Sequence, residues 1–563
     1  MKDEIFSSLQ KASLKISPEF AGRFQVTKPQ DSQHGDWSSN IALIMAKEMK
    51  KNPRELAVEI ISALEGLDYS EKIEVAGAGF INIYLKEDLF FNQIKNYALG
   101  DFKGLLQEKE PKKILLEYVS SNPTGPIHVG HGRSAAFGSA LANLLKVAGN
   151  KVTQEYYVND RGHQAKTLGL SVFIRMQELD NKKIVLPEGC YAGEYIKDLA
   201  AKAKKHFKGK YLVKKDDNLF FETLNEWFEY VDATYENFLE LANYVIELQT
   251  EEIKKDLEVF QVEYDNWFNE SSLYEKDLIQ KSIKNLKNNE VEKKDGALWF
   301  KSTNYGDEKD RVLIRDNEEP TYFASDIAYH KDKYDRDFDE IINIWGADHH
   351  GYIPRVKASI ESLGLDSKKL KTLLIQFVSL KEKGQKVQMS TRSGEFVELS
   401  DLVDEVGIDS ARYYFLARKP EQALEFDIDL AKKTNKDNHV YYIQYAHARI
   451  CSIKKELKKR KIDFNLKESL EKLSLLKETE KEIISLVNGY PEILEQCYKN
   501  NELHPLCFYL RDLSSKFHSF YNAEKIISDD KDYSDAKIAL SIAIKEIINN
   551  GLNILGISCP EKM

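Results

Sequence analysis

Cysteine is scarce in this sequence, and its placement excludes two classes of protein. The few cysteines are spread over 563 residues, and none belongs to a CxxC pair. This spacing argues against a structural zinc site and against the disulfide framework of a small secreted protein. We therefore expect reduced thiols in a cytoplasmic protein. The cysteines are Cys190, Cys451, Cys497, Cys507 and Cys559.

Long apolar runs are also missing from the sequence. No stretch approaches the roughly 20 apolar residues that a membrane-spanning helix needs. The N-terminal segment MKDEIFSSLQKA lacks the basic and apolar regions of a secretory signal. The sequence therefore predicts a chain with no membrane partner.

Basic residues are outnumbered by acidic ones. Lysine and arginine total 81 against 91 aspartates and glutamates, which gives a net charge of −10. Because binding to nucleic acid needs clustered Lys and Arg, such a partner would have to meet a local basic face. The rest of the composition, 42% hydrophobic and 31% charged, is that of a globular protein, and the length predicts two to four domains.

The stretch from Ile114 to Gly149 organises the chain. It opens with the apolar run Ile114–Val119, which has the length of a buried strand, and continues into the turn residues SSNPTGP. From Val129 apolar residues recur at helical spacing until Gly149, which ends the run as a C-cap. Val152–Val158 reads as a second strand. The succession predicts a right-handed βαβ unit.

The predicted helix begins with the sequence HVGHG, residues 128–132. Backbone N–H groups and the dipole at a helix start attract phosphates, and Gly130 and Gly132 would let a phosphate or a base approach the backbone. His128 and His131, at i and i+3, can both donate hydrogen bonds to phosphate oxygens. Taken alone, the pattern is equally compatible with two histidines that cap a loop on a fold without a nucleotide.

The flanking residues carry a family resemblance. HVGH resembles the HIGH signature of class I aminoacyl-tRNA synthetases, and EYVSSNPTGP before it and EYYVND after it resemble the arginyl-tRNA synthetase version. The resemblance implies a mixed α/β fold: a Rossmann-like catalytic domain, an α+β N-terminal domain and an all-α C-terminal anticodon-binding domain. It implies that arginine is ligated to tRNA(Arg) with ATP, through an arginyl-adenylate, with Mg²⁺ accompanying the ATP.

The resemblance also suggests where the domains lie. GDWSSN, NPRELA and GFIN resemble the N-terminal domain of the family, which touches the tRNA elbow, so we expect that domain over residues 1–108. The catalytic domain is expected over 109–400, with a connective insertion at about 162–312, and the anticodon-binding domain over 401–563. We expect a monomer.

The second half of the nucleotide-binding fold is expected after residue 311. Glu340–Gly346 and Thr372–Leu380 read as buried strands, and Ile353–Leu363 as a helix. The cluster Asp348-His349-His350 could pass for metal ligands. Because adjacent residues at a strand end point in opposite directions, nucleotide contact or packing is favoured over zinc.

Residues 381–394, KEKGQKVQMSTRSG, resemble the KMSKS loop, the second class I signature. Such a loop can neutralise the charge that grows on leaving pyrophosphate. Gln388 and Thr391 stand where the signature has its lysines, so we hypothesise that Lys386, rather than Lys383, supplies the main cation. The resemblance assigns catalysis to His128 and His131, our hypothesis adds Lys386 and Arg392 as cations, and the ATP contacts are expected from Gly130, Gly132, His128, His131, Met389 and Ser390.

A pocket for arginine must pair a planar guanidinium, which prefers carboxylates and an aromatic face. Asp326 follows Tyr322 by one helical turn, so both face one way. Ala347 stands where many relatives show Gln, which puts that contact in doubt. The resemblance assigns arginine binding to Glu117, Ser121, Asn122, His131, Tyr322 and Asp326.

The run YYIQYAHAR, residues 441–449, resembles the anticodon-binding helix of the family. Tyr442, Tyr445 and Arg449 lie at i, i+3 and i+7, and such a stripe can stack on unpaired bases. The alternative is the edge of a helical-bundle core. The tRNA-binding residues implied by the resemblance are Tyr442, Gln444, Tyr445 and Arg449.

Three other functions remain open at this point. Another class I synthetase would share HVGH but not an acidic pocket, and a small-molecule nucleotidylyltransferase would not need two RNA-facing modules. A non-catalytic tRNA-binding paralogue would fit the altered MSTR loop.

Overall fold

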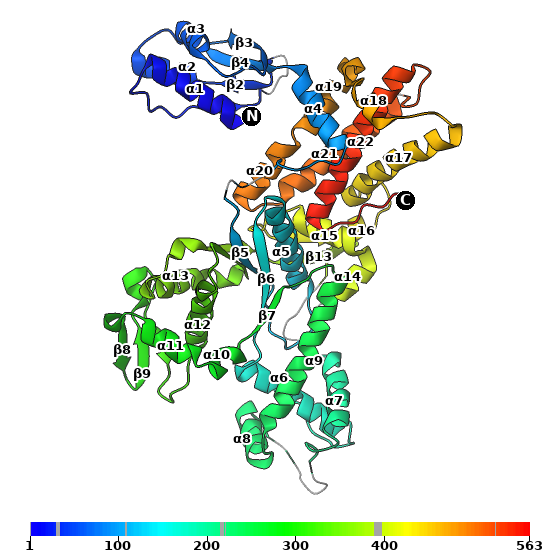
Figure 1. Cartoon of the computed structure of the whole chain (residues 1–563). Coiled ribbons are helices and arrows are strands. Elements are labelled where there is room, and N and C mark those ends of the chain that lie inside the picture. Colours follow the sequence, from blue (N-terminus) through cyan, green and yellow to red (C-terminus); the bar gives the residue numbers. More distant parts are fainter. Residues whose placement is uncertain are drawn as a thin grey trace. The chain divides into compact units, whose positions relative to one another are not determined.

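The computed structural model describes residues 2–29, 34–106, 108, 110–213, 219, 221–387, 397–523 and 525–563. The chain forms two compact units, and Figure 1 shows the elements of both. The first contains Met1–Asp101, Asp463–Asn488 and Lys525–Ile544, and the second contains Phe102–Ile462, Gly489–Glu524 and Lys545–Met563. The range 401–563, expected as one domain, therefore contributes to both units.

The N-terminal part of the first unit is an antiparallel sheet with helices. The strands β1 (Val26–Thr27), β2 (Trp37–Ser39), β3 (Ser70–Ala76) and β4 (Phe80–Leu85) have the order β1-β2-β4-β3. The helices are α1 (Lys2–Ile16), α2 (Ile41–Met49), α3 (Pro53–Ala63) and α4 (Glu87–Ala98). Helix α3 begins with a typical cap, because the Asn52 side chain accepts from two backbone N–H groups and Pro53 occupies the first helical position.

The second unit is built on a five-stranded parallel sheet. Its strands, in the order β12-β11-β5-β6-β7, are Leu370–Ile375, Glu340–Gly346, Lys113–Glu117, Lys151–Val158 and Asn266–Asn269. β5 lies in the middle, so its apolar residues are covered on both faces, as in other parallel sheets. Ligands of such sheets bind at the carboxyl ends of the strands, and the loop after β5 carries the predicted site.

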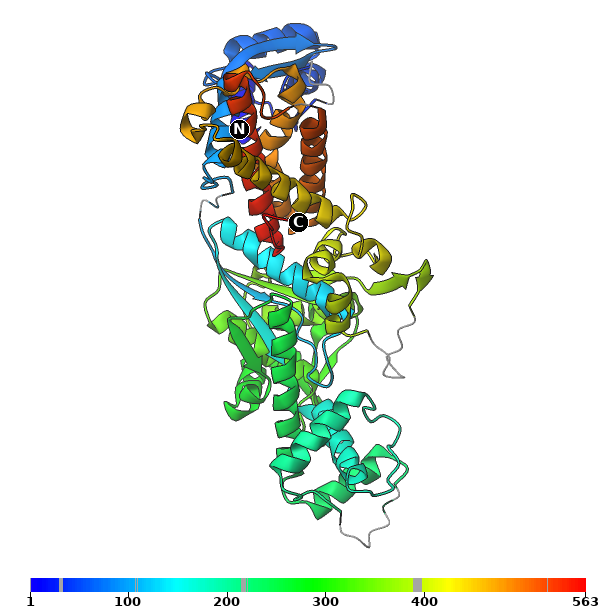
Figure 2. The same cartoon turned by 90° about the vertical axis from the view of Figure 1, so that its right-hand side faces the viewer.

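The predicted βαβ unit is confirmed. Helix α5 spans Val129–Val147, and Gly149 follows with φ +92°, the left-handed conformation expected after a helix end. Figures 1 and 2 show α5 beside β5 and β6 in both views. The helix approaches the end of β5 so closely that a Cβ atom on Gly138 would lie 2.3 Å from the Tyr118 ring, so only glycine fits there.

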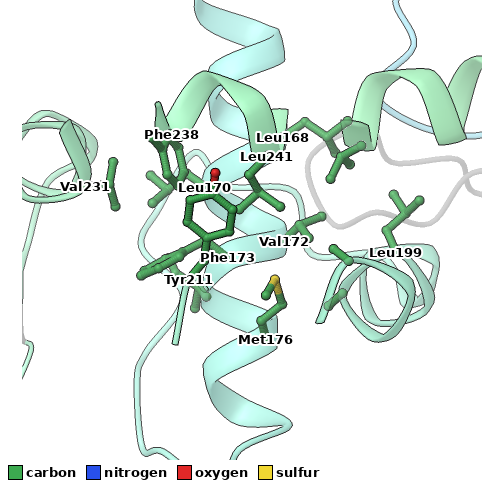
Figure 3. Close-up of a cluster of buried hydrophobic side chains, with 14 of the residues drawn as sticks. Leu168, Leu170, Val172, Phe173, Met176, Leu199, Tyr211, Val231, Phe238 and Leu241 are labelled. Carbon is green, nitrogen blue, oxygen red and sulfur yellow. The ribbon is translucent and has the colours of Figure 1, made fainter. Parts of the chain in front are cut away.

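The expected insertion is mostly helical but is not continuous. Its first part has a core of its own between the helices α6 (Gly162–Glu178), α7 (Glu194–His206), α8 (Leu224–Thr234) and α9 (Phe238–Val259), and Figure 3 shows the buried side chains. The chain then returns to the central sheet as β7. The elements after β7 are α10 (Ser271–Glu275), α11 (Leu278–Asn285), β8 (Val291–Lys294), β9 (Ala297–Phe300) and β10 (Arg311–Ile314), followed by α12 (Tyr322–Asp335).

The prediction of one strand over Thr372–Leu380 is wrong. The chain leaves the central sheet after β12 and forms a second sheet, ordered β14-β13-β15, from Gln385–Lys386, Val378–Glu382 and Leu424–Asp427. At the break, the Gln376 N–H donates to the Pro420 carbonyl at 2.8 Å instead of continuing the first ladder. β11 is confirmed with its expected bounds, and α13 (Ile353–Ser362) follows the short turn η4 (Ala347–Tyr352).

The remaining elements are helical. They are α14 (Leu399–Val406), α15 (Ile408–Leu416), α16 (Ile428–Ala431), α17 (His439–Arg460), α18 (Leu466–Leu470), α19 (Lys481–Asn488), α20 (Tyr490–Asn500), α21 (His504–Ala523) and α22 (Lys531–Leu555). α22 is long and apolar enough to span a membrane, against the sequence expectation, with a mean hydropathy of 1.3. Because 72% of that apolar window is buried within the protein, α22 fits the role of a core helix.

Candidate active site

The site begins in a strained loop after β5. Val119 and Ser120 have φ angles of +65° and +42°, a left-handed conformation that is unfavourable for a β-branched residue. Neighbouring hydrogen bonds hold it: the Val119 N–H donates to Ser134 Oγ at 3.3 Å, and the Tyr156 hydroxyl bonds the Ser121 hydroxyl at 2.8 Å and its carbonyl at 2.9 Å. The Ser121 side chain is thus already bonded within the protein.

The two histidines of HVGH lie face to face at the start of α5. Their ring centroids are 3.6 Å apart, and His128 Nδ1 accepts from the Gly130 N–H at 3.1 Å. Burial lowers the pKa of His128, and burial together with His128 lowers the pKa of His131 to about 3. Both rings are therefore neutral at physiological pH. Because His128 Nδ1 is an acceptor, its proton resides on Nε2.

The expectation of free backbone N–H groups at this helix start is wrong for three residues. Val129 donates to the Val397 carbonyl at 3.2 Å, Gly130 donates to His128 Nδ1, and Gly132 donates to the His128 carbonyl at 3.1 Å. Residues 397–399 return alongside the helix start and take the Val129 N–H, whereas His128 itself takes those of Gly130 and Gly132.

The two glycines of HVGHG differ in what they make room for. A Cβ atom on Gly132 would lie 2.5 Å from Leu399 Cδ1, so Gly132 admits an α14 side chain and not a nucleotide. This corrects its assignment to ATP binding. A Cβ atom on Gly130 would meet only the His128 ring, so this position stays open to a ligand.

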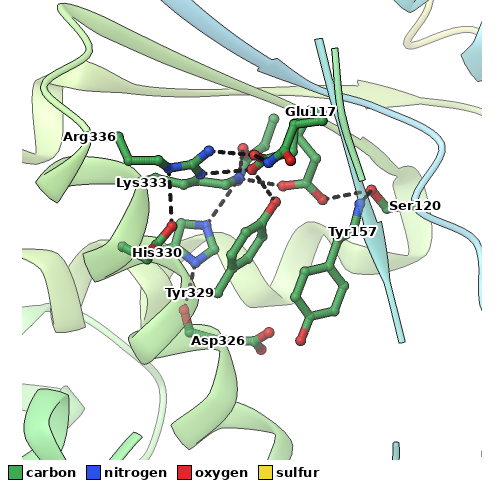
Figure 4. A network of polar contacts seen from close by, with 12 residues as sticks. Glu117, Ser120, Tyr157, Asp326, Tyr329, His330, Lys333 and Arg336 are labelled. Atoms are coloured by element: carbon green, nitrogen blue, oxygen red, sulfur yellow. Dashed lines mark hydrogen bonds and ion pairs between the residues drawn. The ribbon is translucent and has the colours of Figure 1, made fainter. Parts of the chain in front are cut away.

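Glu117, at the end of β5, belongs to a buried ion pair. Its Oε2 binds the Lys333 ammonium from α12, and its Oε1 accepts from the Ser120 hydroxyl at 2.9 Å. Lys333 also donates to Asn343 Oδ1 at 2.7 Å, and Figure 4 shows these contacts with those of His330. Glu117 therefore already has a cation, whereas the sequence predicted a carboxylate available to the guanidinium.

Asp326 has no such partner. Its backbone carbonyl accepts from His330 Nδ1 at 2.8 Å, but among the described residues no side chain bonds its carboxylate. Burial, then Glu270 and Glu117, raise the pKa of Asp326 to about 7. Tyr322, one turn earlier on α12, is 49% exposed. The structure thus brings a carboxylate without a cation next to an accessible aromatic ring.

Glu270 is a second acid at this site that sequence reasoning missed. It is buried directly after β7, where its N–H donates to the Val158 carbonyl at 3.0 Å. In the amide orientation that satisfies its neighbours, Asn159 donates to Glu270 Oε2 at 2.9 Å. Burial raises the pKa of Glu270. Its place at the carboxyl end of a strand was the signal that could have found it.

Asn122 is exposed at the edge of the site. Its side-chain amide lies 3.1 Å from that of Asn159, so the two amides form a pair between the loop after β5 and the end of β6. This places the side chain at the same strand ends as Glu117 and Glu270.

A cavity of about 870 Å³ lies beside the site, between α6, α9 and α10. Gly162 lines this cavity and also lies close to Tyr322, since a Cβ atom on Gly162 would lie 3.3 Å from the Tyr322 hydroxyl. Its lining does not include His128, His131 or Asp326, so we regard it as a neighbour of the reaction centre. Among the described residues, no three acidic, histidine or cysteine side chains gather as metal ligands.

The β13–β14 hairpin carries the lysines of the second signature. Lys381 lies 3.7 Å from Glu425, and Lys383 lies 3.6 Å from Glu382. Lys386 in β14 is exposed, and no carboxylate of the described residues lies within ion-pair distance of it. Met389, Ser390 and Arg392 lie outside the described residues.

The aromatic stripe expected on α17 packs against α21. The ring centroids of Tyr442 and Tyr445 lie 4.2 and 5.5 Å from that of His518; the two tyrosines keep part of their surface accessible, whereas His518 is buried. The Arg449 guanidinium lies over the Tyr445 ring at 4.6 Å and over the Tyr521 ring at 5.0 Å. Sequence reasoning did not assign His518 or Tyr521 to the site, because spacing on one helix says nothing about the helix packed against it.

Gln444 does not belong to this stripe. It is buried, and its amide donates to Asp409 Oδ2 at 2.7 Å and to the Ser558 carbonyl at 2.9 Å. A residue two positions after Tyr442 faces another side of the helix. The assignment of Gln444 to tRNA binding is therefore corrected: it fixes the C-terminal segment.

Comparison with known families decides what kind of protein this is. The model for "tRNA synthetases class I (R), catalytic domain" matches residues 93–483. The "Arginyl tRNA synthetase N terminal domain" model matches residues 1–85, and the "DALR anticodon binding domain" model matches residues 443–563. The chain belongs to the arginyl-tRNA synthetase family.

Individual arginyl-tRNA synthetases agree with this. The arginine–tRNA ligase of Legionella pneumophila (strain Corby) is 42% identical, with 100% of this chain and 99% of the relative covered. That of Thioalkalivibrio sulfidiphilus is also 42% identical, with 100% of both covered.

Solved structures show the same fold. A putative arginyl-tRNA synthetase from Campylobacter jejuni has a TM-score of 0.74 at 35% identity, covering 85% of this chain and all of that one. The Thermus thermophilus arginyl-tRNA synthetase has a TM-score of 0.76 at 20% identity over the whole of both chains.

Membership of the arginyl-tRNA synthetase family confirms the expected activity. The chain is an arginine–tRNA ligase, which charges tRNA with arginine and uses ATP as a substrate. The alternatives of another class I synthetase, a nucleotidylyltransferase and a non-catalytic paralogue are thereby set aside.

Proposed function

We propose that the carboxyl edge of the parallel sheet binds arginine with its guanidinium at Asp326 and Glu270. The observation that carries this is a difference in charge balance: Glu117 is paired with Lys333, whereas the Asp326 carboxylate has no bonded partner among the described residues. A guanidinium pairs with two carboxylates in a way that an ammonium cannot copy. Tyr322 supplies the aromatic face, and Glu117 borders the pocket as the partner of Lys333.

The same geometry provides discrimination. Burial raises the pKa of both acids, and Glu270 also raises that of Asp326, so two ionised acids are unfavourable there until a cation arrives. A substrate without the guanidinium leaves them unsatisfied, which penalises it by a factor of roughly 10⁴. We assign the α-amino and carboxylate ends of arginine to Asn122, Ser121 and His131. Because the Ser121 hydroxyl is bonded to Tyr156, any contact from Ser121 would share that hydroxyl.

The proposed reaction has two steps. An oxygen of the arginine carboxylate attacks the α-phosphorus of ATP, and the bond to pyrophosphate breaks, giving arginyl-adenylate. A terminal ribose hydroxyl of tRNA(Arg) then attacks the arginyl carbonyl, and AMP leaves. Neither step needs a protein nucleophile, so catalysis is positioning and charge stabilisation.

The residues proposed for the ATP are those at the helix start and on the hairpin. Neutral His128 and His131 donate N–H groups to phosphate oxygens, and Gly130 leaves room for the nucleotide. Lys386 is the described cation proposed for the phosphates, and contacts from Met389, Ser390 and Arg392, which lie outside the described residues, remain expectations from the family resemblance. Mg²⁺ is expected to accompany the ATP, and among the described residues no three acidic, histidine or cysteine side chains gather to hold it.

The tRNA is proposed to contact two further regions. The stripe of Tyr442, Tyr445 and Arg449 stacks on unpaired anticodon-loop bases, and the N-terminal domain touches the elbow. We retain 1–108, 109–400 and 401–563 as functional ranges. We propose a monomer that works in the cytoplasm without a membrane partner.

ATP–pyrophosphate exchange tests the proposal. Exchange is measured with each amino acid, with and without tRNA(Arg), for the wild type and for Asp326→Asn. Of the amino acids tested, we expect only arginine to support exchange, and only when tRNA(Arg) is present. In Asp326→Asn we expect a large rise in the KM for arginine. Asp335→Asn, on the same helix in a surface ion pair with Lys331, is the control and should keep the wild-type KM. An unchanged KM in Asp326→Asn would refute the assignment.

A further inference from the structure

Arg133 is a buried cation without a carboxylate. Its side chain is 1% exposed, and no acidic group of the described residues lies within ion-pair distance. A buried charge persists only when its hydrogen bonds are satisfied, so its partners indicate what it holds in place. Arg133 lies in the first turns of α5, shortly after His131.

All three hydrogen bonds of this guanidinium go to backbone carbonyls. One terminal nitrogen donates to Gln376 and Gln422, and the other donates to Lys419, each at 2.8 Å. Gln376 lies between β12 and β13, and Gln422 and Lys419 lie just before β15. The guanidinium thus binds the roots of two paired strands at once.

Those two strands carry the β13–β14 hairpin. β13 pairs in parallel with β15 from Val378 to Lys381, and β14 pairs back onto β13, with Lys386 opposite Lys381. The Arg133 guanidinium thus bonds the start of the hairpin through Gln376 and the segment before β15 through Lys419 and Gln422, while Gln385 and Lys386 of β14 are exposed. The position of Lys386 relative to the helix start therefore depends on how that root is fixed.

We propose that Arg133 is a positioning residue that holds the Lys386 hairpin in register with His128 and His131. This inference rests on the proposed role of Lys386 at the ATP phosphates. The planar guanidinium of arginine can donate to three carbonyls from two separate nitrogens, whereas lysine has a single ammonium nitrogen. A shorter cation at position 133 would let the root shift, and a displacement of about 1 Å can cost roughly 10²-fold in rate.

The experiment compares Arg133→Lys with a matched buried arginine. Arg412 is also fully buried, and it donates to the carbonyls of Leu555 and Phe260 and to Ser139 Oγ at 2.8 Å, without a contact to the hairpin root. Both variants are assayed by ATP–pyrophosphate exchange with tRNA(Arg), and arginine binding is measured by equilibrium dialysis. We expect Arg133→Lys to lose at least about tenfold in kcat/KM for ATP and to keep its affinity for arginine. Arg412→Lys should keep both values.

A double-mutant cycle separates positioning from general damage. If Arg133 acts through Lys386, adding Arg133→Lys to Lys386→Ala should cost little beyond the single Lys386→Ala change. Additive losses, or an equal loss in Arg412→Lys, would overturn the inference. So would an Arg133→Lys variant with the wild-type kcat/KM for ATP.

Two further outcomes are informative. If Lys386→Ala alone leaves exchange intact, the proposed role of Lys386 fails and the inference falls with it. If Lys386→Ala is impaired but Arg133→Lys is not, only the inference fails. Circular dichroism and thermal unfolding report folding, and Arg133→Gln, which keeps two donors without a buried charge, replaces a lysine variant that does not fold. For Arg133→Gln we likewise expect a loss of at least about tenfold in kcat/KM for ATP and an unchanged affinity for arginine.

Discussion

The ammonium of Lys333 on α12 binds the carboxylate of Glu117 at the end of β5, and both side chains are almost entirely buried. This pair joins the helix that carries Asp326 to the strand that starts the catalytic loop. Because the pair neutralises itself, the negative charge available to a guanidinium comes mainly from Asp326 and Glu270. Glu117, which the family resemblance assigned to arginine binding, is therefore already paired within the fold.

The first prediction concerns the stability of this pair. Lys333→Met should destabilise the protein by about 3–5 kcal/mol, because it leaves the Glu117 carboxylate buried without a partner. Lys333→Met with Glu117→Gln should recover much of that loss. Urea unfolding of the two single variants and the double variant measures the coupling. Equal stability of Lys333→Met and the wild type would show that Glu117 is not held as the structure indicates.

The second prediction is a pH dependence of arginine binding. Burial, then Glu270 and Glu117, raise the pKa of Asp326 to about 7, and Arg355 and Lys333 act in the opposite sense. Below that pH the acid is protonated and attracts the guanidinium poorly. Affinity for arginine should therefore rise from pH 6 to pH 8 and then level off. Equilibrium dialysis at a series of pH values measures this, and Asp326→Asn should flatten the curve; an equally steep curve in the variant would assign the proton to another group.

The third prediction follows from the same pKa but concerns folding. The folded pKa of Asp326 lies above the value of about 4 for an unfolded aspartate. As pH rises from about 4 to about 7 the unfolded chain loses this proton first, so the group progressively destabilises the fold, and above about 7 the effect is constant. Asp326→Asn should thus match the wild type at pH 4 and be more stable at pH 8. Urea unfolding at both pH values checks the sign.

The local signals of the sequence explain how much of this fold could be predicted. Apolar runs and turn residues located β5, α5, β6 and β11 closely, since their lengths and caps depend on neighbours in sequence. The break between β12 and β13 was not visible, because it depends on a hydrogen bond from Gln376 to Pro420, far along the chain. The pattern of apolar residues predicts a strand, but a hydrogen bond to a residue far along the chain determines where that strand passes from one sheet to another.

The candidate site shows the same limit. The HVGH motif, Tyr322 and Asp326 could be found because motif and helical spacing are local. The pairing of Glu117 with Lys333, the filling of Gly132 by Leu399 and the acid Glu270 depend on contacts across the fold. Residue type and motif indicate which groups can act, but only packing shows which are already occupied.

The fourth prediction separates the two faces of α17. Tyr445→Ala should raise the KM for tRNA by about tenfold or more, since stacking on an aromatic ring is worth roughly 1–3 kcal/mol per base. Gln444→Ala should leave that KM unchanged and lower thermal stability, because it removes the bonds to Asp409 and Ser558. Aminoacylation kinetics and thermal unfolding measure the two effects. A raised KM in Gln444→Ala would restore Gln444 to the tRNA surface.

The last prediction concerns the cation that serves the departing pyrophosphate. Lys383 lies beside Glu382 at 3.6 Å, and Lys381 lies beside Glu425 and Asp427 at 3.7 and 3.8 Å, so nearby acids offset both charges. Lys386 has no such neighbour among the described residues, and its full charge is available to a phosphate. Removing one preorganised group that stabilises developing charge costs about 10²-fold in rate, which is the loss we expect for Lys386→Ala in pyrophosphate exchange. Lys383→Ala, on the same hairpin, is the control and should stay within about twofold of the wild type on the same reasoning. Wild-type exchange in Lys386→Ala together with a large loss in Lys383→Ala would reverse the assignment.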